Sequence, residues 1–185
     1  MKYAFNLVIL AFSLMACNGP SEVYQEKIAT VDSLIVVVDD YQTRYNMVDS
    51  VSIKDQIAKI EAIAKTLRGP KVSQENKKYW TKTLAPLDLV ITPYQKYLRD
   101  KVKIERQLAY SQSQLLALRK SLQDEVIDTA AADKYILDEK RAVGGLYMLK
   151  IKRIEPTIEA QNIWDTTAVM FQNMADSVDA LPLNK

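Results

Sequence analysis

The sequence predicts an all-α protein: an elongated, antiparallel helical bundle with coiled-coil-like seams and four to six helices. Two observations support this prediction. Glycine and proline, the residues that interrupt helices, number only 4 and 6 among 185 residues, and good helix formers dominate the remainder. Apolar side chains also recur at alternating spacings of three and four residues over long stretches, which is the period of a helix face packed against neighbours.

The first helical stretch follows Pro20, with Ser21 as the expected N-cap. A second stretch ends before Gly69-Pro70, and Ser50 or Ser52 offers a cap for it. No glycine or proline lies between residues 21 and 68, so one long helix with a kink near residues 48–52 and two separate helices both fit the pattern. The first seam consists of Tyr24, Ile28, Val31, Ile35, Val38 and Tyr45.

The middle of the chain is expected to contain the longest helix. Residues 73–84 predict a short helix, and residues 87–91 resemble an apolar connection packed onto the bundle. Thr92-Pro93 then predicts a helix start, because proline fits the first helical position, where no backbone N–H is needed. The seam that follows consists of Tyr94, Tyr97, Lys101, Ile104, Leu108, Ser111, Leu115, Leu118 and Leu122.

The last third predicts one or two further helices. Asp128 or Thr129 is expected to cap the first of them, and Pro156 either starts a final helix or kinks a continuous one. Gly144-Gly145 lies in the interior, where each glycine costs about 1 kcal/mol relative to alanine. Two interpretations fit this pair. The first is close helix packing or a bend in the helix, and the second is a gap left for a ligand. The final seam consists of Ala160, Trp164, Ala168, Phe171, Ala175, Val178 and Leu181.

The N-terminal segment has the pattern of an export signal. Met1-Lys2 is followed by an apolar run from Leu7 to Ala16, which is shorter than the roughly 20 residues that span a bilayer. Leu14-Met15-Ala16-Cys17 resembles the lipobox of bacterial lipoproteins. The resemblance implies cleavage between Ala16 and Cys17 and attachment of diacylglycerol and acyl chains to Cys17, with no other cofactor. An ordinary secretory signal and a short uncleaved anchor are the alternatives.

These features divide the chain into three parts. We expect residues 1–16 to be a cleaved signal peptide, residues 17–20 a short lipid-anchored tether and residues 21–185 a single helical-bundle domain. Asn18 follows the cysteine at the position where, in lipoproteins, an aspartate favours retention in the inner membrane. The predicted location is therefore the cell envelope, at the outer membrane and facing the periplasm.

Charge is distributed in blocks along the chain. Residues 22–61, 124–139 and 155–185 are net acidic, and residues 65–106 and 140–153 are net basic. Such blocks commonly set which helices lie beside each other. The alternative is that part of the basic block contacts an anionic partner, either lipid headgroups or an acidic protein. The candidate contacts are Lys77, Lys78, Lys82, Lys96, Arg99 and Lys103.

Several chemistries lack their usual residues. The chain has no histidine and one cysteine, so we expect no metal site and no enzymatic activity. The nearly neutral balance of an exported chain argues against nucleic acid as a partner. The helical pairs Tyr41/Tyr45 and Tyr94/Tyr97 are expected in the core or at an interface, with an aromatic glycan-binding platform as the alternative.

Together these features favour a membrane-anchored envelope lipoprotein that acts as a structural or accessory protein-interaction module, through a protein partner or self-association. The alternative function is a lipoprotein that binds a small ligand, a glycan or a foreign protein. A small-ligand binder should have an enclosed cavity, expected near Gly144-Gly145 or the tyrosine pairs. An interaction module should have a long exposed face and no enclosed pocket.

Overall fold

The computed structural model describes residues 20–69 and 82–181 of the chain. The regular secondary structure of these residues is entirely helical, as the sequence predicts. The elements are α1 (Glu22–Asn46), α2 (Ser50–Leu67), α4 (Ala85–Gln123), α5 (Thr129–Leu149), the π-helical turn η1 (Lys150–Ile154) and α6 (Glu155–Asp179). The helix predicted within residues 73–84 lies mostly outside the described residues.

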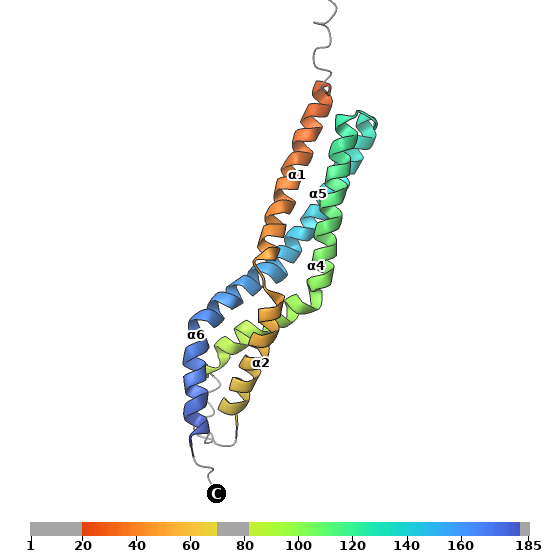
Figure 1. The fold of residues 1–185 in the computed structure, drawn as a ribbon. Helices are drawn as coiled ribbons and strands as arrows, with labels where there is room; N and C mark the ends of the chain where they lie inside the picture. The colour runs from red at the N-terminus through yellow and green to blue at the C-terminus, as the bar shows by residue number, and fades with distance from the viewer. Residues whose placement is uncertain (1–19, 70–81, 182–185) are drawn as a thin grey trace, which may run out of the picture.

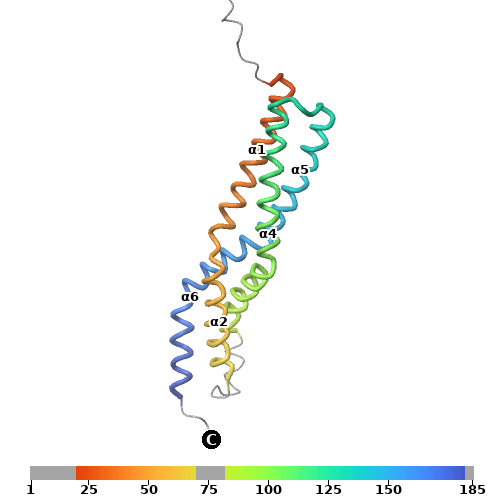
Figure 2. Tube along the Cα trace, turned by 45° about the vertical axis from the view of Figure 1, so that its right-hand side comes forward, coloured from red at the N-terminus to blue at the C-terminus, as the bar shows by residue number. Residues whose placement is uncertain are grey.

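The helices form three antiparallel legs of an elongated rod (Figure 1). The first leg is α1 followed by α2, the second is α4 alone, and the third runs from α5 through η1 into α6. In one half of the rod α1, α4 and α5 pack together; in the other half α2, α4 and α6 do so. The first half of α4 belongs to one three-helix segment and its second half to the other, which is why the molecule is long and narrow (Figure 2).

The predicted seams form the core of the rod. In α4, all seam positions except Lys101 are buried, and in α6 the buried side chains include Ala160, Trp164 and Phe171. Ser111 is a buried polar residue in this core, and the half-buried Lys101 donates from Nζ to Ser50 Oγ at 2.7 Å. The three-and-four spacing therefore predicted correctly which faces the helices bury, except at Leu181, the last residue of the final seam, which is 48% exposed.

Residues 21–68 form two helices. The chain leaves α1 at Asn46 and enters α2 at Ser50. The cap of α2 is Asp49, whose carboxylate accepts a hydrogen bond from Val51 N at 2.9 Å, so the predicted caps Ser50 and Ser52 were wrong. At the start of α1, Ser21 does occupy the N-cap position, but its side chain makes no capping hydrogen bond.

The longest helix begins eight residues before the predicted start. It starts at Ala85 with Pro86 in its first turn, and Pro93 lies in its interior; the predictions of a start at Thr92-Pro93 and of a connection over residues 87–91 were both wrong. An interior proline disfavours a helix by roughly 3 kcal/mol. Burial of Leu87 and Val90, which are 1% and 0% exposed, offsets this at about 1.5–3 kcal/mol each.

The third leg is continuous through Pro156. Asp128 caps α5 by accepting a hydrogen bond from Ala131 N at 2.8 Å. At the other end of α5, Glu155 N–H donates to Lys150 O, five residues earlier, and Pro156 follows in the first turn of α6. Prolines and π-helical turns are both places where a long helix bends without ending. Pro156 therefore lies in a continuous leg, the second of the two predicted alternatives.

Ion pairs join the three legs, and one of them follows the pattern that the charge blocks predict. Arg119 Nε of α4 lies 2.6 Å from Asp32 Oδ1 of α1, and Lys27 of α1 pairs with Asp133 of α5. Lys150 of η1 lies 2.8 Å from an Asp40 oxygen of α1. The pair of Lys150 with Asp40 joins the basic block 140–153 to acidic α1, as expected for charge blocks that set neighbouring helices. The pair of Lys27 with Asp133 joins two net acidic blocks and does not follow that pattern.

Candidate binding groove

The N-terminal end of the rod is held by the turn between α4 and α5. Ser21 N donates to Glu125 Oε1 at 2.6 Å, and the Tyr24 hydroxyl donates to the Ile127 carbonyl at 2.6 Å. The predicted cleavage and lipidation residues, Ala16 and Cys17, lie outside the described residues. Cys17 is three residues from Pro20, and three residues reach at most about 11 Å. A lipid on Cys17 would therefore attach the rod at this end.

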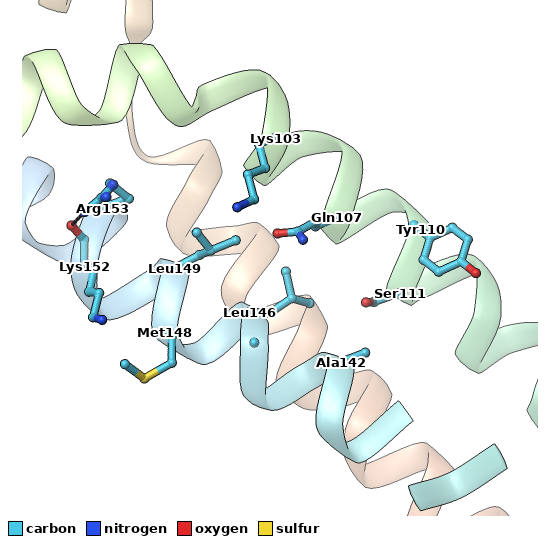
Figure 3. A pocket seen from close by; sticks show the side chains of 11 residues that line it. Lys103, Gln107, Tyr110, Ser111, Ala142, Leu146, Met148, Leu149, Lys152 and Arg153 are labelled. Carbon is cyan, nitrogen blue, oxygen red and sulfur yellow. Dashed lines mark hydrogen bonds between the residues drawn. The ribbon is translucent and has the colours of Figure 1, made fainter. Parts of the chain in front are cut away.

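A groove lies between α4 and the α5–η1 leg (Figure 3). Its volume is about 540 Å³. We call it the α4–α5 groove and define it by the residues that line it: Lys103, Gln107, Tyr110, Ser111, Ala142, Gly145, Leu146, Met148, Leu149, Lys152 and Arg153.

The surface of the groove is apolar at its base and mixed at its rim. Leu146 and Ser111 are buried, and Leu149 is partly buried. Tyr110 and Met148 are 63% and 45% exposed. Exposed aromatic and methionine side chains over an apolar base are typical of surfaces that bind another molecule.

Gly145 forms part of this groove, and nothing in the described residues requires a glycine there. A Cβ atom built on Gly144 or on Gly145 would have no atom within 4 Å. Neither residue has a positive φ angle. Close helix packing is therefore wrong as the explanation for this pair. Gly145 lines the groove, and a gap left for a ligand stays a prediction.

Basic residues gather at one end of the groove. Lys103 and Gln107 extend from α4 toward Leu149 and Leu146 (Figure 3), and Lys152 and Arg153 line the same end from η1. Within the described part of the chain, neither lysine ammonium group has an ion pair or hydrogen bond, whereas Arg153 pairs with Asp100.

Asp100 is strongly held in its charged form beside this end. Hydrogen bonds from Arg99 and Arg153 lower the pKa of the Asp100 carboxyl to about 2. The Arg99 and Arg153 charges are thus partly compensated by Asp100. The cations of the groove that are free to meet a ligand charge are the two lysines.

A smaller recess continues along the same two helices. It is lined by Gln114, Ala117, Leu118, Ser121, Ile127, Tyr135 and Glu139, with a volume of about 170 Å³. One carboxylate oxygen of Glu139 is buried and, among the described residues, receives no hydrogen bond. Burial raises the pKa of Glu139, with a smaller contribution from Asp138. The groove and this recess together follow α4 from Lys103 to Ser121.

The predicted basic contacts do not form one site. Lys77 and Lys78 lie outside the described residues. Lys82 precedes α4, and Lys96 is in its first half, which belongs to the half of the rod that is distant from Ser21. Of the predicted cations that lie in the described part of the chain, Lys103 alone lines the groove. Contact with headgroups next to the anchor stays a prediction, and for Lys82 and Lys96 it requires the rod to lie along the membrane.

The predicted tyrosine pairs lie mainly in the core. Tyr94 and Tyr97 are fully buried, and Tyr41 is 8% exposed. The Tyr94 hydroxyl donates to Gln56 Oε1 at 2.5 Å, and the rings of Tyr45 and Tyr97 lie 6.2 Å apart at a tilt. Burial raises the pKa of Tyr94 and Tyr97. These side chains stabilise the rod and do not form an exposed glycan platform.

Most of the groove could not be predicted from the sequence. Lys152 and Arg153 are about fifty residues from Lys103 in the chain, and no sequence pattern joins them. The one available signal was the Gly144-Gly145 pair within an otherwise regular helical pattern. In residues 20–69 and 82–181, no three carboxylate or cysteine side chains are grouped to hold a metal ion, and no helix combines the length and apolar character needed to cross a bilayer.

Comparison with known proteins adds no assignment. No family model, no curated protein and no solved structure matches this chain.

Proposed function

We propose that this chain is an envelope lipoprotein, anchored through acyl chains on Cys17, whose three-helix rod binds a protein partner. The observation that carries the proposal is that the two ends of the rod differ. The chain enters α1 directly after the lipobox-type segment, and hydrogen bonds from Ser21 and Tyr24 fix that entry to the α4–α5 turn. One end is thus suited to attachment, while the length of the rod extends away from it (Figure 1).

The groove favours a macromolecular partner over a small ligand. It is an open channel between two helices, and apolar side chains such as Tyr110 and Met148 are exposed along its rim. A small-molecule site usually encloses most of its ligand. The second candidate function, binding of a small ligand, has one observation in its favour: the groove volume of about 540 Å³ lies in the range of small-molecule sites, roughly 300–1,000 Å³.

The anchor is tested by mass analysis of the mature protein from its native host. We expect the first residue to be Cys17 carrying diacylglycerol, and the protein to fractionate with membranes. The Cys17→Ser variant removes the thiol that accepts the lipid and should leave the membrane fraction or remain unprocessed. An unmodified N-terminus at any other residue of the wild-type protein would exclude the lipoprotein assignment.

The interaction role is tested by crosslinking in intact cells with the lipidated protein. We expect a defined protein adduct that Cys17→Ser weakens, because loss of the anchor lowers the local concentration of the rod at the membrane. Capture of a small molecule, with no protein adduct from any face of the rod, would favour the second candidate function.

A further inference from the structure

We propose that the α4–α5 groove is the docking site for an amphipathic helix of a partner protein. This helix is acidic at the end that lies over Lys103 and Lys152, and it carries a hydrogen-bond donor at the end that reaches Glu139. This inference rests on the proposed interaction function and names its surface and the chemistry of its partner.

The shape of the site fits a helix. The groove and the adjoining recess are lined by α4 residues at intervals of three and four, among them Lys103, Gln107, Tyr110, Gln114 and Ser121. At 1.5 Å per residue, Lys103 to Ser121 covers about 27 Å, or five helical turns. A helix laid along α4 and α5 would complete a four-helix bundle in the half of the rod that contains α1.

Gly145 allows this helix to come close. The two interior glycines disfavour α5 by about 1 kcal/mol each, and no contact within the described chain accounts for them. A missing side chain at Gly145 lowers the wall of the groove and leaves room for the backbone of an incoming helix. Gly144 does not line the groove and therefore provides a matched position for comparison.

The charges of the site give the partner helix a direction. Lys103 and Lys152 lack carboxylate partners among the described residues and lie at one end of the groove. The buried Glu139 oxygen, which receives no hydrogen bond there, lies in the recess toward the other end. A buried acceptor of this kind is stabilised by a donor, and the unpaired ammonium groups by carboxylates. The complementary helix is therefore acidic at one end and carries a lysine, arginine or amide at the other.

The test is site-specific photocrosslinking of the full chain in its native cells. A photoreactive residue replaces Met148 at the basic end of the groove or Tyr135 in the recess. Met170 on α6, which is 45% exposed like Met148, serves as the control outside the groove. We expect protein adducts at Met148 and Tyr135 and none at Met170. The peptide joined to Met148 should be the acidic end of an amphipathic helix, and that joined to Tyr135 its opposite end.

Two variants separate docking from folding. Gly145→Leu puts a side chain into the groove, whereas Gly144→Leu adds the same side chain beside it. Both should fold, because each Cβ meets open space, and thermal unfolding checks this. The adduct at Met148 should fall at least tenfold in Gly145→Leu and in the double variant Lys103→Glu/Lys152→Glu, and should persist in Gly144→Leu.

Several results would overturn the inference. These are no adduct at Met148, an adduct of lipid or small-molecule mass, a captured peptide of this same chain, or a captured peptide without acidic residues. Equal adduct yields in the Gly145→Leu and Gly144→Leu variants would overturn it as well. Protein adducts found only at positions outside the groove would refute docking in the groove and leave the proposed interaction function standing. Adducts at Met148 from a chain with an unmodified N-terminus would refute the anchor and leave the groove standing.

Discussion

Replacing the α5 glycines with alanine should stabilise the protein. Gly144 and Gly145 lie inside a regular helix without positive φ angles, and an added Cβ at either residue meets nothing within 4 Å. Alanine in a helix interior is favoured over glycine by about 0.5–1 kcal/mol. We expect each substitution to raise the free energy of unfolding by that amount, and the double variant by roughly 1–2 kcal/mol.

The effect is large enough to measure by circular dichroism at 222 nm. For a domain of this size, 1 kcal/mol corresponds to roughly 2–4 °C in Tm, so the double variant should melt about 2–8 °C higher. Gly69→Ala is the contrasting control. Its Cβ would lie 3.1 Å from the Thr66 carbonyl oxygen and 3.2 Å from that of Lys65, so we expect no comparable gain. A lower Tm for Gly145→Ala or Gly144→Ala would refute the conclusion that the fold does not need these glycines.

Three further predictions concern the core, a cap and an ion pair. Phe171→Ala should lower the unfolding free energy by about 3–5 kcal/mol, because Phe171 is 0% exposed, while Val169→Ala, at 73% exposed, should change it by less than about 0.5 kcal/mol in urea unfolding. Asp49→Ala should lower the free energy of unfolding by about 1 kcal/mol, because the hydrogen bond to the α2 N-terminus is lost; the same urea unfolding curves measure this. The pKa of Asp100 in the folded protein is about 2, below the usual value near 3.9, so its contribution to the free energy of unfolding is present above pH 4 and is lost as the pH falls toward 2. The difference in unfolding free energy between wild type and Asp100→Asn should therefore shrink over that window. A difference that stays constant would contradict the assigned pairing.

The helical period predicted the packing faces better than it predicted the helix ends. Leu108, Leu115 and Leu122 are buried as their spacing requires, because a side chain's place on a helix depends only on the helix geometry. The predicted start of α4 was wrong because Thr92-Pro93 satisfies every local signal for a helix N-terminus. The burial of Leu87 and Val90, upstream of Pro93, keeps the helix intact through the proline. That burial depends on packing against α2 and α6, and a local sequence pattern holds no information about those helices.

The groove was less predictable than the fold for the same reason. The sequence placed Lys103 in a group with Lys82 and Lys96 because they are near in the chain. In a helix rod, however, chain distance becomes distance along the axis, and from the start of α4 at Ala85 to Lys103 the helix rises about 27 Å at 1.5 Å per residue. The neighbours that matter for Lys103 are Lys152 and Arg153, which arrive from the antiparallel third leg.

The rod also fixes how a docked helix would be oriented relative to the membrane. Glu125, next to the N-terminal attachment end, is 22 residues beyond Lys103 in the chain, or about 33 Å along the helix. In a rod standing on the membrane, the acidic end of the partner helix would therefore be remote from the bilayer, and the end near Glu139 would be closer to it. A partner anchored in the same membrane would need only a short linker if it entered the groove from the Glu139 end. Entry from the Lys103 end would need roughly eight more extended residues to cover the length of the groove and recess. Crosslinks from Tyr135 should thus map nearer to the membrane anchor of such a partner than crosslinks from Met148, and the reverse order would mean that the partner enters the groove from the Lys103 end through the longer linker.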